Sequence, residues 1–350
     1  MKRMLGVAVL LGTAVAAVSA IHAAEPQLQQ PAWAYGVPPA GQQGQPARDD
    51  GTVFSLPGTD RKFTFNQIRG RVSNDTPERI GPADWYPGDH PAMPKIVADG
   101  DNARGIVACS LCHYPNGKGR SENASPAGLP HDYIVRQLHN MKDDLRQSAE
   151  RRKANTQAMV SFAKAMTEEE IQAAAAYFSS MQWTPWIKVV ESTTAPKFRS
   201  QGGLFLPLEG AAAGTEPIDG RIIEVPVDGM HTETLRDPRS GFIAYVPVGA
   251  VAKGKDIVTT GGGGKTLQCA ICHGADLNGI GSVPGIAARS PSYIARQLND
   301  IKQGARHGDM AELMKQVVAK LTPDDITNIA AYTASLPAPA SGGATRAAQR

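Results

Sequence analysis

Apolar residues recur at helical spacing in two segments of the chain, residues 131 to 146 and residues 291 to 306. In the first segment they fall at i, i+4, i+7 and i+11, which places them on one face of a helix. The apolar positions are Ile134, Leu138, Met141 and Leu145 in the first segment and Ile294, Leu298 and Ile301 in the second. Each segment therefore predicts an amphipathic helix.

A second pair of helices is predicted at residues 166 to 178 and 321 to 333. Thr167 stands three residues before Glu170, which is the spacing of a capping box, and Thr322 opens the sequence Thr-Pro-Asp-Asp. Both helices are therefore expected to begin just after these threonines, with an acidic first turn.

These two pairs of segments are copies of each other. Shifted by 160 residues, HDYIVRQLHNMKDDLR (131 to 146) aligns with PSYIARQLNDIKQGAR (291 to 306). Shifted by 155 residues, MTEEEIQAAAAYF (166 to 178) aligns with LTPDDITNIAAYT (321 to 333), so the second copy has five fewer residues between its helices. We infer two related domains, which agrees with a chain too long for one compact core.

Between the two repeats the pattern changes to short runs of β-branched and aromatic residues. The runs KVVES, GRIIEVPV and GFIAYVPVG are broken by Gly and Pro and predict short strands, in a small sheet or a docking surface for a redox partner. Upstream, residues 25–92 are rich in proline, glycine and glutamine and hold too few apolar residues for a core. We expect a disordered arm there, followed by loops wrapped over the first domain.

Residues 1–24 have the features of a secretory signal peptide, because Lys2 and Arg3 precede an apolar run that small residues follow. A membrane anchor is the alternative, but the run is short for a span. We expect an exported, soluble protein in the periplasm, with no membrane span after signal removal. The formal net charge of +3 includes Lys2 and Arg3, so the mature chain carries +1, and no basic run predicts a nucleic-acid partner.

Two tight cysteine pairs carry the chemistry, in CSLCH at residues 109 to 113 and CAICH at residues 269 to 273. Disulfides are one alternative in an exported protein, but disulfide frameworks usually scatter their cysteines. A zinc cage or a thioredoxin-like pair is another, but the pairs lie too far apart for a zinc ribbon and their surroundings look helical. The C-x-x-C-H motif best suits covalent haem attachment. The predicted attachment residues are Cys109, Cys112, Cys269 and Cys272, with His113 and His273 as iron ligands.

Each haem iron needs a sixth ligand, and a methionine thioether is usual where electron transfer is the task. Met159 aligns with Met314 under the 155-residue shift, so we expect these two to ligate iron. Met141 aligns with Ile301 on the apolar stripe and is predicted to be a core residue. Gap-filling in a core is the alternative role for any of these methionines. The methionines with no methionine counterpart are Met166, Met181 and Met310.

A proline follows each motif, Pro126 thirteen residues after His113 and Pro284 eleven residues after His273. In such sites a backbone carbonyl commonly accepts the hydrogen bond of the ligand's Nδ1, which leaves Nε2 for iron. The other histidines of the mature chain have no histidine counterpart in the repeat, so none is expected to ligate iron.

Each repeat resembles a class I cytochrome c domain, since C-x-x-C-H, proline, a Tyr-Ile-x-Arg-Gln-Leu helix, methionine and a capped Ala-Ala-Tyr helix follow in that order. The tandem is similar to the exported dihaem cytochromes of the c4 group. The resemblance implies a mainly α fold with domains at residues 93–182 and 252–337, each around one covalent haem c with His and Met axial ligands. Residues 183–251 join them, and a flexible tail, 338–350, follows. The expected haem-pocket positions are Pro126, Tyr133, Arg136, Pro284, Tyr293 and Arg296.

The resemblance implies a carrier of single electrons rather than an enzyme. Its partners would be redox proteins: a periplasmic dehydrogenase, whose cytochrome subunit it could be, a membrane redox complex, a terminal oxidase or a small cytochrome. The alternative is a dihaem cytochrome c peroxidase. A peroxidase needs one iron whose sixth site is available to peroxide, whereas here both irons have a matched methionine.

Overall fold

The structure is a computed structural model that describes residues 31–38, 49–70 and 81–339. The expected signal peptide, residues 1–24, lies outside the described residues, as do parts of the N-terminal extension and most of the expected tail. In the described parts of the chain, no helix has the length and apolarity needed to cross a bilayer.

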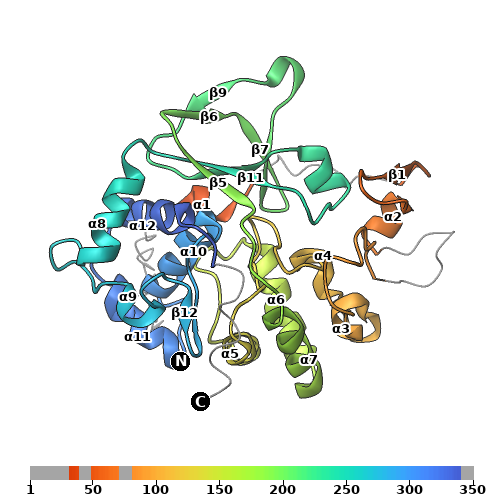
Figure 1. Ribbon diagram of the computed structural model, residues 1–350, viewed down its shortest axis with the longest axis horizontal. Coiled ribbons are helices and arrows are strands. Elements are labelled where there is room, and N and C mark those ends of the chain that lie inside the picture. Colours follow the sequence, from red (N-terminus) through yellow and green to blue (C-terminus); the bar gives the residue numbers. More distant parts are fainter. Residues whose placement is uncertain (1–30, 39–48, 71–80, 340–350) are drawn as a thin grey trace, which may run out of the picture. The chain divides into compact units, whose positions relative to one another are not determined.

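Three helices pack around the first cysteine motif: α5 (His131–Lys142), α6 (Ala154–Ala165) and α7 (Glu168–Ser179) (Figure 1). Helix α5 contacts both of the others. Three residues of its predicted apolar stripe, Ile134, Leu138 and Met141, belong to one hydrophobic cluster. The fourth, Leu145, lies past the end of the helix and is only partly buried, so the helix is shorter than predicted. The motif itself forms the short helix α4 (Cys109–His113), which follows the single helical turn α3 (Lys95–Ala98) and a 3-10 turn at Asn102–Arg104.

The second motif lies in a corresponding set of helices. These are α8 (Ala250–Thr260), α9 (Ala270–His273), α10 (Pro291–Lys302), α11 (Asp309–Val318) and α12 (Pro323–Ser335). Helix α12 packs against α8 and α10. The approach of α8 to α12 requires Gly254, because a Cβ atom at that position would lie 1.9 Å from the carbonyl oxygen of Asn328.

Both predicted capping boxes form. The Thr167 hydroxyl accepts a hydrogen bond from the backbone N–H of Glu170, and the Glu170 carboxylate accepts one from the backbone N–H of Thr167. Thr322 and Asp325 repeat the arrangement at the start of α12. Since a cap sets the residue at which a helix begins, α7 and α12 start at equivalent positions of the repeat.

Three of the strands form a sheet that touches both domains: β5 (Ile187–Glu191), β10 (Ile223–Pro226) and β11 (Phe242–Val246). They lie in the runs that predicted strands, and β11 is central, antiparallel to β10 and parallel to β5. At one end of β11, Phe242 packs into the hydrophobic cluster of the first domain. At the other end, Val246 packs into that of the second domain. The sheet therefore holds the two domains together.

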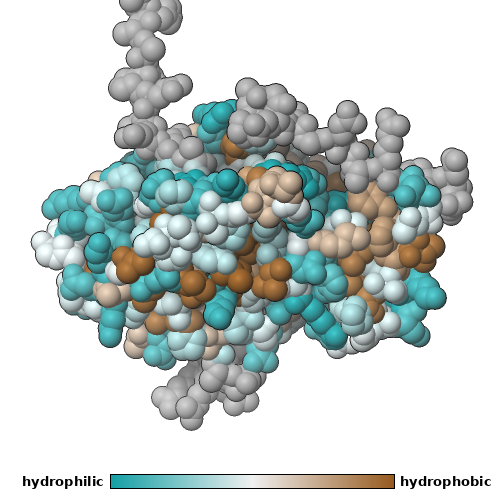
Figure 2. Space-filling model, turned by 90° about the horizontal axis from the view of Figure 1, so that it is seen from above, coloured by the Kyte–Doolittle hydropathy of each residue, from teal (hydrophilic) through white to brown (hydrophobic). Residues whose placement is uncertain are grey.

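The remaining strands of the described chain form short antiparallel pairs. They are β1 (Val53–Ser55) with β2 (Lys62–Thr64), β3 (Gly100–Asp101) with β4 (Ile106–Val107), β6 (Thr194–Pro196) with β9 (Thr215–Pro217), β7 (Phe198–Gln201) with β8 (Leu204–Pro207), and β12 (Gly279–Ile280) with β13 (Val283–Pro284). The fold is thus mainly helical with short strands only. On the surface, Figure 2 shows hydrophobic side chains gathered in patches among hydrophilic ones.

The described part of the N-terminal extension has a small core, so the prediction that residues 25–92 cannot form one was wrong. Leu56, Ile68, Trp85 and Tyr86 are buried in one cluster. Two of these side chains are aromatic, and each aromatic ring buries a large area. The cluster is completed by Leu235, from the segment between the domains, and by the partly buried Phe54, Phe63 and Ala83. A local reading of composition cannot reveal the contribution of Leu235.

The extension also reaches the second domain and does not only wrap the first. Helix α1 (Ala32–Tyr35) packs against α10, and the Tyr35 hydroxyl donates a hydrogen bond of 2.7 Å to Asp300. The second short helix of the extension is α2 (Phe65–Ile68), whose first turn is capped by Thr64.

An arginine of the first domain reaches across to the second. Arg146 donates hydrogen bonds to the Tyr293 hydroxyl at 2.8 Å and to Oε1 of Gln297 at 3.1 Å. It also donates to Oε1 of Gln137 in its own domain at 2.9 Å. Arg146 is buried and aligns with Arg306 under the 160-residue shift.

Arg306 makes the equivalent contacts in the opposite direction. It donates to the Tyr133 hydroxyl at 3.1 Å, to Gln137 at 3.0 Å and to Gln297 at 2.9 Å. A backbone bridge between Arg146 and Arg306 joins the two halves of this network. The domains therefore meet through a hydrogen-bonded contact in which each copy of the repeat plays the same part.

We expect Arg146→Met to lower the free energy of unfolding by about 1.5 to 3 kcal/mol, because the buried Gln137 and the partly buried Tyr293 and Gln297 lose a charged donor. Denaturant titration of the haem-loaded protein measures this. Arg136→Met is the control, since Arg136 is only partly buried and should change stability by about 0.5 kcal/mol or less. Equal losses in both variants would contradict the role given to Arg146.

Candidate haem sites

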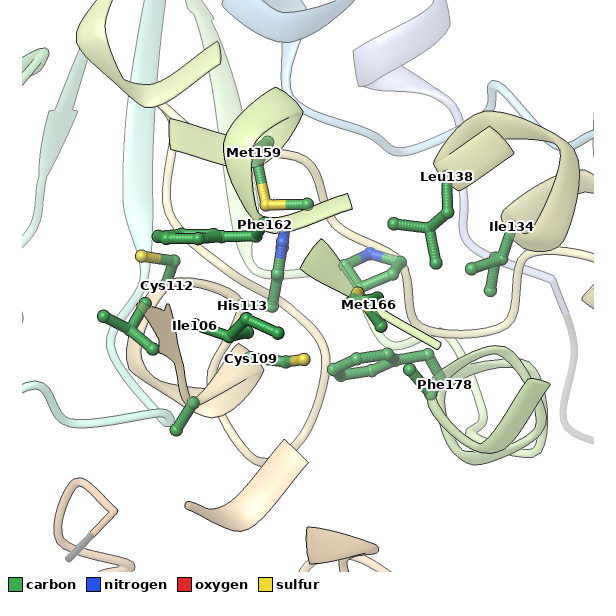
Figure 3. A pocket seen from close by; sticks show the side chains of 14 residues that line it. Ile106, Cys109, Cys112, His113, Ile134, Leu138, Met159, Phe162, Met166 and Phe178 are labelled. Carbon is green, nitrogen blue, oxygen red and sulfur yellow. The ribbon is translucent and has the colours of Figure 1, made fainter. Parts of the chain in front are cut away.

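The first motif opens onto an apolar cavity. Cys109, Cys112 and His113 enter it from α4, and Met159 enters it from α6 (Figure 3). The other walls are mostly apolar side chains. They are Ile106, Val107, Ala108, Pro126, Ile134, Leu138, Phe162, Met166, Ala174 and Phe178. Four residues predicted from sequence spacing are therefore brought to one cavity.

Each motif histidine is held by one hydrogen bond from Nδ1. His113 donates to the carbonyl oxygen of Ala124 at 2.9 Å, and His273 donates to that of Pro284 at 2.8 Å. Burial lowers the pKa of both imidazoles, which favours the neutral ring. In a neutral ring whose Nδ1 carries the proton of this hydrogen bond, Nε2 has a free lone pair for a metal, as in a metal-ligating histidine.

The acceptor in the first domain is not the proline that sequence spacing suggested. Ala124 accepts the hydrogen bond, and Pro126 lies on the cavity wall instead. Ala124 is the true counterpart of Pro284, since 160 residues separate them. Alignment by the repeat, rather than by residue type, therefore identifies the acceptor.

The second motif repeats the arrangement on a more open surface. Cys269 precedes α9, and Cys272 and His273 lie within it. His273 is buried, whereas Cys272 is exposed. Cys269 and Met314 pack against the same hydrophobic cluster of the second domain.

Three of the residues predicted for the haem pockets, Tyr133, Tyr293 and Arg296, lie at the contact between the domains. Tyr133 and Tyr293 accept hydrogen bonds from the arginine of the opposite domain. Arg296 is buried and donates to the carbonyl oxygens of Ala34 and Ser121, at 2.8 and 2.7 Å. Arg136, its counterpart in the repeat, is only partly buried. It lines neither the apolar cavity nor a larger cavity beside it, so the two arginines are not equivalent.

Residues of both domains line a larger cavity of about 370 Å³ beside the first site. His113 and Met159 border it from the first domain, and Tyr293 and Arg296 border it from the second. Its walls carry charged groups of both signs as well as apolar side chains. Three are cationic, Arg146, Lys153 and Arg296, and two are carboxylates, Glu122 and Asp300.

Comparison with known proteins agrees with this geometry. A family profile described as cytochrome c matches residues 97–182 and 251–337. Cytochrome c-554(548) of Halomonas halodenitrificans is 32% identical over 88 residues, which cover 96% of that protein and 25% of this chain. The chain belongs to the cytochrome c family. Two such domains in tandem mean two covalently bound haem c groups, and this dihaem cytochrome transfers electrons.

Two further relatives match over longer stretches of this cytochrome. The thiosulfate dehydrogenase electron acceptor of Stutzerimonas stutzeri is 24% identical over 245 residues, covering 69% of this chain and 85% of that protein. Cytochrome c4 of Azotobacter vinelandii is 29% identical over 165 residues, covering 40% of this chain and 76% of that protein. The first of these matches is long enough to span both domains, and the resemblance to the c4 group is confirmed.

The residues at the first site of this cytochrome fit a covalent haem. Two thiols lie on one side of an apolar cavity, where burial raises the pKa of Cys109 to about 12 and keeps the thiol uncharged. The Lys153 ammonium is buried on the wall of the larger cavity, and among the described residues it has no hydrogen-bond partner. Haem carries carboxylates, so such a cation fits one edge of the group.

Two thioethers line the smaller cavity, although the repeat favours only one. Met159 is partly buried and Met166 is buried, and both face the space beside His113. Met166 aligns with Leu321, so the repeat does not predict it as an iron ligand. Met141, predicted to be a core residue, is buried in the hydrophobic cluster of the first domain.

Sequence reasoning missed Phe162, Lys153 and Arg146, which line the cavities of the first site. Phe162 belongs to no repeated motif and reaches the cavity only because α6 folds over α4. Lys153 has no lysine counterpart in the repeat. Arg146 and Arg306 could have been found, since they end the two aligned segments at the same offset as the cysteines.

Met159→Ala is expected to remove about half of the near-infrared sulfur-to-iron absorption, since one of two thioether ligands is lost, and to lower one midpoint potential. Met166→Ala should keep the absorption, as should Met141→Ala, which instead costs about 2 to 5 kcal/mol of stability. Visible and near-infrared spectra with chemical unfolding separate the three. Loss of the band in Met166→Ala with none in Met159→Ala would reverse the choice of ligand.

Lys153→Met is expected to lower one of the two midpoint potentials by tens of millivolts, roughly, because a buried cation stabilises ferrous over ferric haem. Burial lowers the pKa of Lys153 to about 7, so the amine loses its charge as pH rises through that value. The difference between variant and wild type should therefore shrink with rising pH, and an anionic haem edge moves that window upward. Spectroelectrochemical titration measures it. Lys164→Met, at an exposed lysine paired with Asp144, should leave both potentials unchanged.

Proposed function

We propose that this cytochrome is an exported periplasmic carrier of single electrons and not an enzyme. In the proposal, one haem is attached to Cys109 and Cys112 and the other to Cys269 and Cys272. The axial ligands of the first iron would be His113 and Met159, and those of the second iron would be His273 and Met314. The observation that carries the proposal is the convergence of two thiols, a neutral imidazole and a thioether on one apolar cavity.

When bound, each haem supplies an iron that alternates between the ferrous and ferric states. The residues around each haem limit the structural rearrangement that accompanies this change of oxidation state. The hydrogen bonds from His113 and His273 hold the rings in one tautomer and orientation, so Nε2 stays aimed at the same place. Apolar walls such as Ile134, Leu138 and Phe178 exclude water, which limits the reorganisation that each electron transfer requires.

The partner that the relatives favour is a dehydrogenase. One relative is named a thiosulfate dehydrogenase electron acceptor. Another, the cytochrome subunit of sulfide dehydrogenase of Chlorobaculum tepidum, is 33% identical over 97 residues. We infer that this cytochrome takes electrons from a periplasmic dehydrogenase, as a separate carrier or as a subunit, and passes them to another redox protein such as a membrane complex, a terminal oxidase or a small cytochrome.

A carrier with a protein ligand on each side of both irons has no vacancy for peroxide. We expect the protein, reduced by one electron, to stay low-spin, to bind no carbon monoxide or cyanide rapidly, and to consume peroxide no faster than free haem. Electron paramagnetic resonance and a peroxide assay with a reduced cytochrome as donor measure this. Met159→Ala is the positive control, because it opens one site.

A high-spin fraction that appears on partial reduction, together with peroxide turnover, would contradict the carrier and make the protein a peroxidase. Reversible voltammetry with two one-electron waves is the complementary result that a carrier must show. The two measurements together test the proposal in both directions.

A further inference from the structure

The two haem motifs differ sharply in how much protein covers them. Under the 160-residue shift, Leu111 of the first motif aligns with Ile271 of the second, and Arg120 aligns with Ile280. Arg120 is 4% exposed, whereas Ile280 is 58% exposed. Leu111 is partly buried and Ile271 is 64% exposed. The repeat thus supplies a comparison within one chain between a covered and an uncovered motif.

Residues 230–238, here called the cover segment, account for the difference at the first motif. Arg236 donates to the carbonyl oxygen of Leu111 at 2.9 Å, and the Tyr114 hydroxyl donates to that of Thr232 at 3.2 Å. These contacts lie against the motif itself, on the side of Cys112, which is partly buried.

Two more contacts extend the cover along the loop that follows the motif. Asn116 donates to the carbonyl oxygen of Pro238 at 2.7 Å, and Arg120 pairs with Glu233 at 2.6 Å. The cover segment is anchored in turn by Trp85, whose ring N–H donates to the Leu235 carbonyl at 2.7 Å. The first motif is therefore enclosed by both the N-terminal extension and the segment between the domains.

The second motif has no such cover among the described residues, and large apolar side chains stand around it instead. Ile280 lies close to the motif, because a Cβ atom on Gly274 would be 3.2 Å from its side chain. The loop that carries Leu267 is tied to α11 by a 2.8 Å hydrogen bond from Thr266 to Val317. The exposed apolar residues around Cys272, here called the apolar rim, are Leu267, Ile271, Ile280 and Leu313.

Most charged groups near the apolar rim are paired. Lys265 forms an ion pair with Asp325, and Lys315 forms one with Glu312 on either side of Leu313. The exposed Asp276, between Cys272 and Ile280, forms no ion pair among the described residues. A rim with few unpaired charges offers a charged partner little attraction, and it costs little to desolvate against another apolar surface. An exposed apolar patch at a redox centre marks a place where another protein docks.

We propose that the apolar rim around Cys272 is the site at which electrons enter or leave the protein, and that it docks a redox protein whose own cofactor edge lies within an uncharged apolar surface. This rests on the proposed function as an electron carrier. A haem edge bonded to the exposed Cys272 would reach the surface, whereas an edge bonded to the partly buried Cys112 would lie beside the cover segment. Because the rate of electron tunnelling falls steeply with distance, the second haem is the port and the first exchanges electrons through it.

Ile271→Lys in the haem-loaded protein tests this, with Leu267→Lys as an independent variant and Val227→Lys as the matched control. Val227 is 67% exposed and belongs to the segment between the domains. The probe is a purified ferric single-haem class I cytochrome c, mixed in a stopped-flow instrument with the fully reduced protein. An ionic strength of about 0.5 M screens long-range attraction, so the contact surface decides the rate.

We expect Ile271→Lys and Leu267→Lys to lower the second-order rate constant about tenfold, because docking must bury an ammonium group. Val227→Lys should stay within about twofold of wild type. All four proteins should contain two haems and keep both midpoint potentials. Unchanged rate constants in both rim variants, or an equal loss in the Val227 variant, would contradict the proposal that electrons enter or leave at the apolar rim.

Two further outcomes separate this inference from other possibilities. A wild-type protein that fails to reduce the probe at all, despite reversible potentials, would contradict the proposed function rather than the port. Sedimentation that shows a concentration-dependent dimer abolished by Ile271→Lys would assign the apolar rim to a second copy of this chain, and would overturn the redox partner as its occupant.

Discussion

The hydrogen bond from each motif histidine to the loop behind it is the constraint on which both sites depend. In both domains the acceptor lies eleven residues after the histidine, at Ala124 and at Pro284. The bond occupies Nδ1 and aims Nε2 into the cavity, so the motif and its loop must be built as one unit. Helices α5 and α10 follow this loop directly, and their apolar stripes close the same space.

The two domains are joined by polar contacts more than by a shared core. Each has its own hydrophobic cluster, while Arg146 and Arg306 exchange hydrogen bonds across the contact. Buried arginine keeps its charge in such a place, and its planar group can serve several acceptors at once. The cavity beside the first site lies against this contact, so the residues that hold the domains together also set the electrostatic surroundings of the first haem.

The two repeats have equivalent helices, but the segments outside the repeats make the surroundings of the two motifs different. The cover segment and the N-terminal extension enclose one motif with a charge cluster that includes the buried Arg120 and the partly buried Glu233. Burial, and then the nearby charges of Arg120 and Arg69, lower the pKa of Arg236 to about 10. Such a cluster is stable only while its ion pairs stay intact, which makes this side of the molecule specific to one packing. The second motif keeps an open, apolar surface.

Sequence alone determined what is local or repeated: the attachment motifs, the helices with their capping boxes, and the pairing of Met159 with Met314, which stays a prediction. These follow from spacing, because 3.6-residue periodicity and side-chain caps act within a few residues. Tertiary structure decided that Ala124 is the acceptor, that Met166 shares the cavity, and that a few residues of the extension form a core with Leu235. It also decided which motif is covered. The core with Leu235 and the cover over the first motif depend on contacts between segments more than a hundred residues apart, and no local pattern encodes which distant side chain will fill a given space.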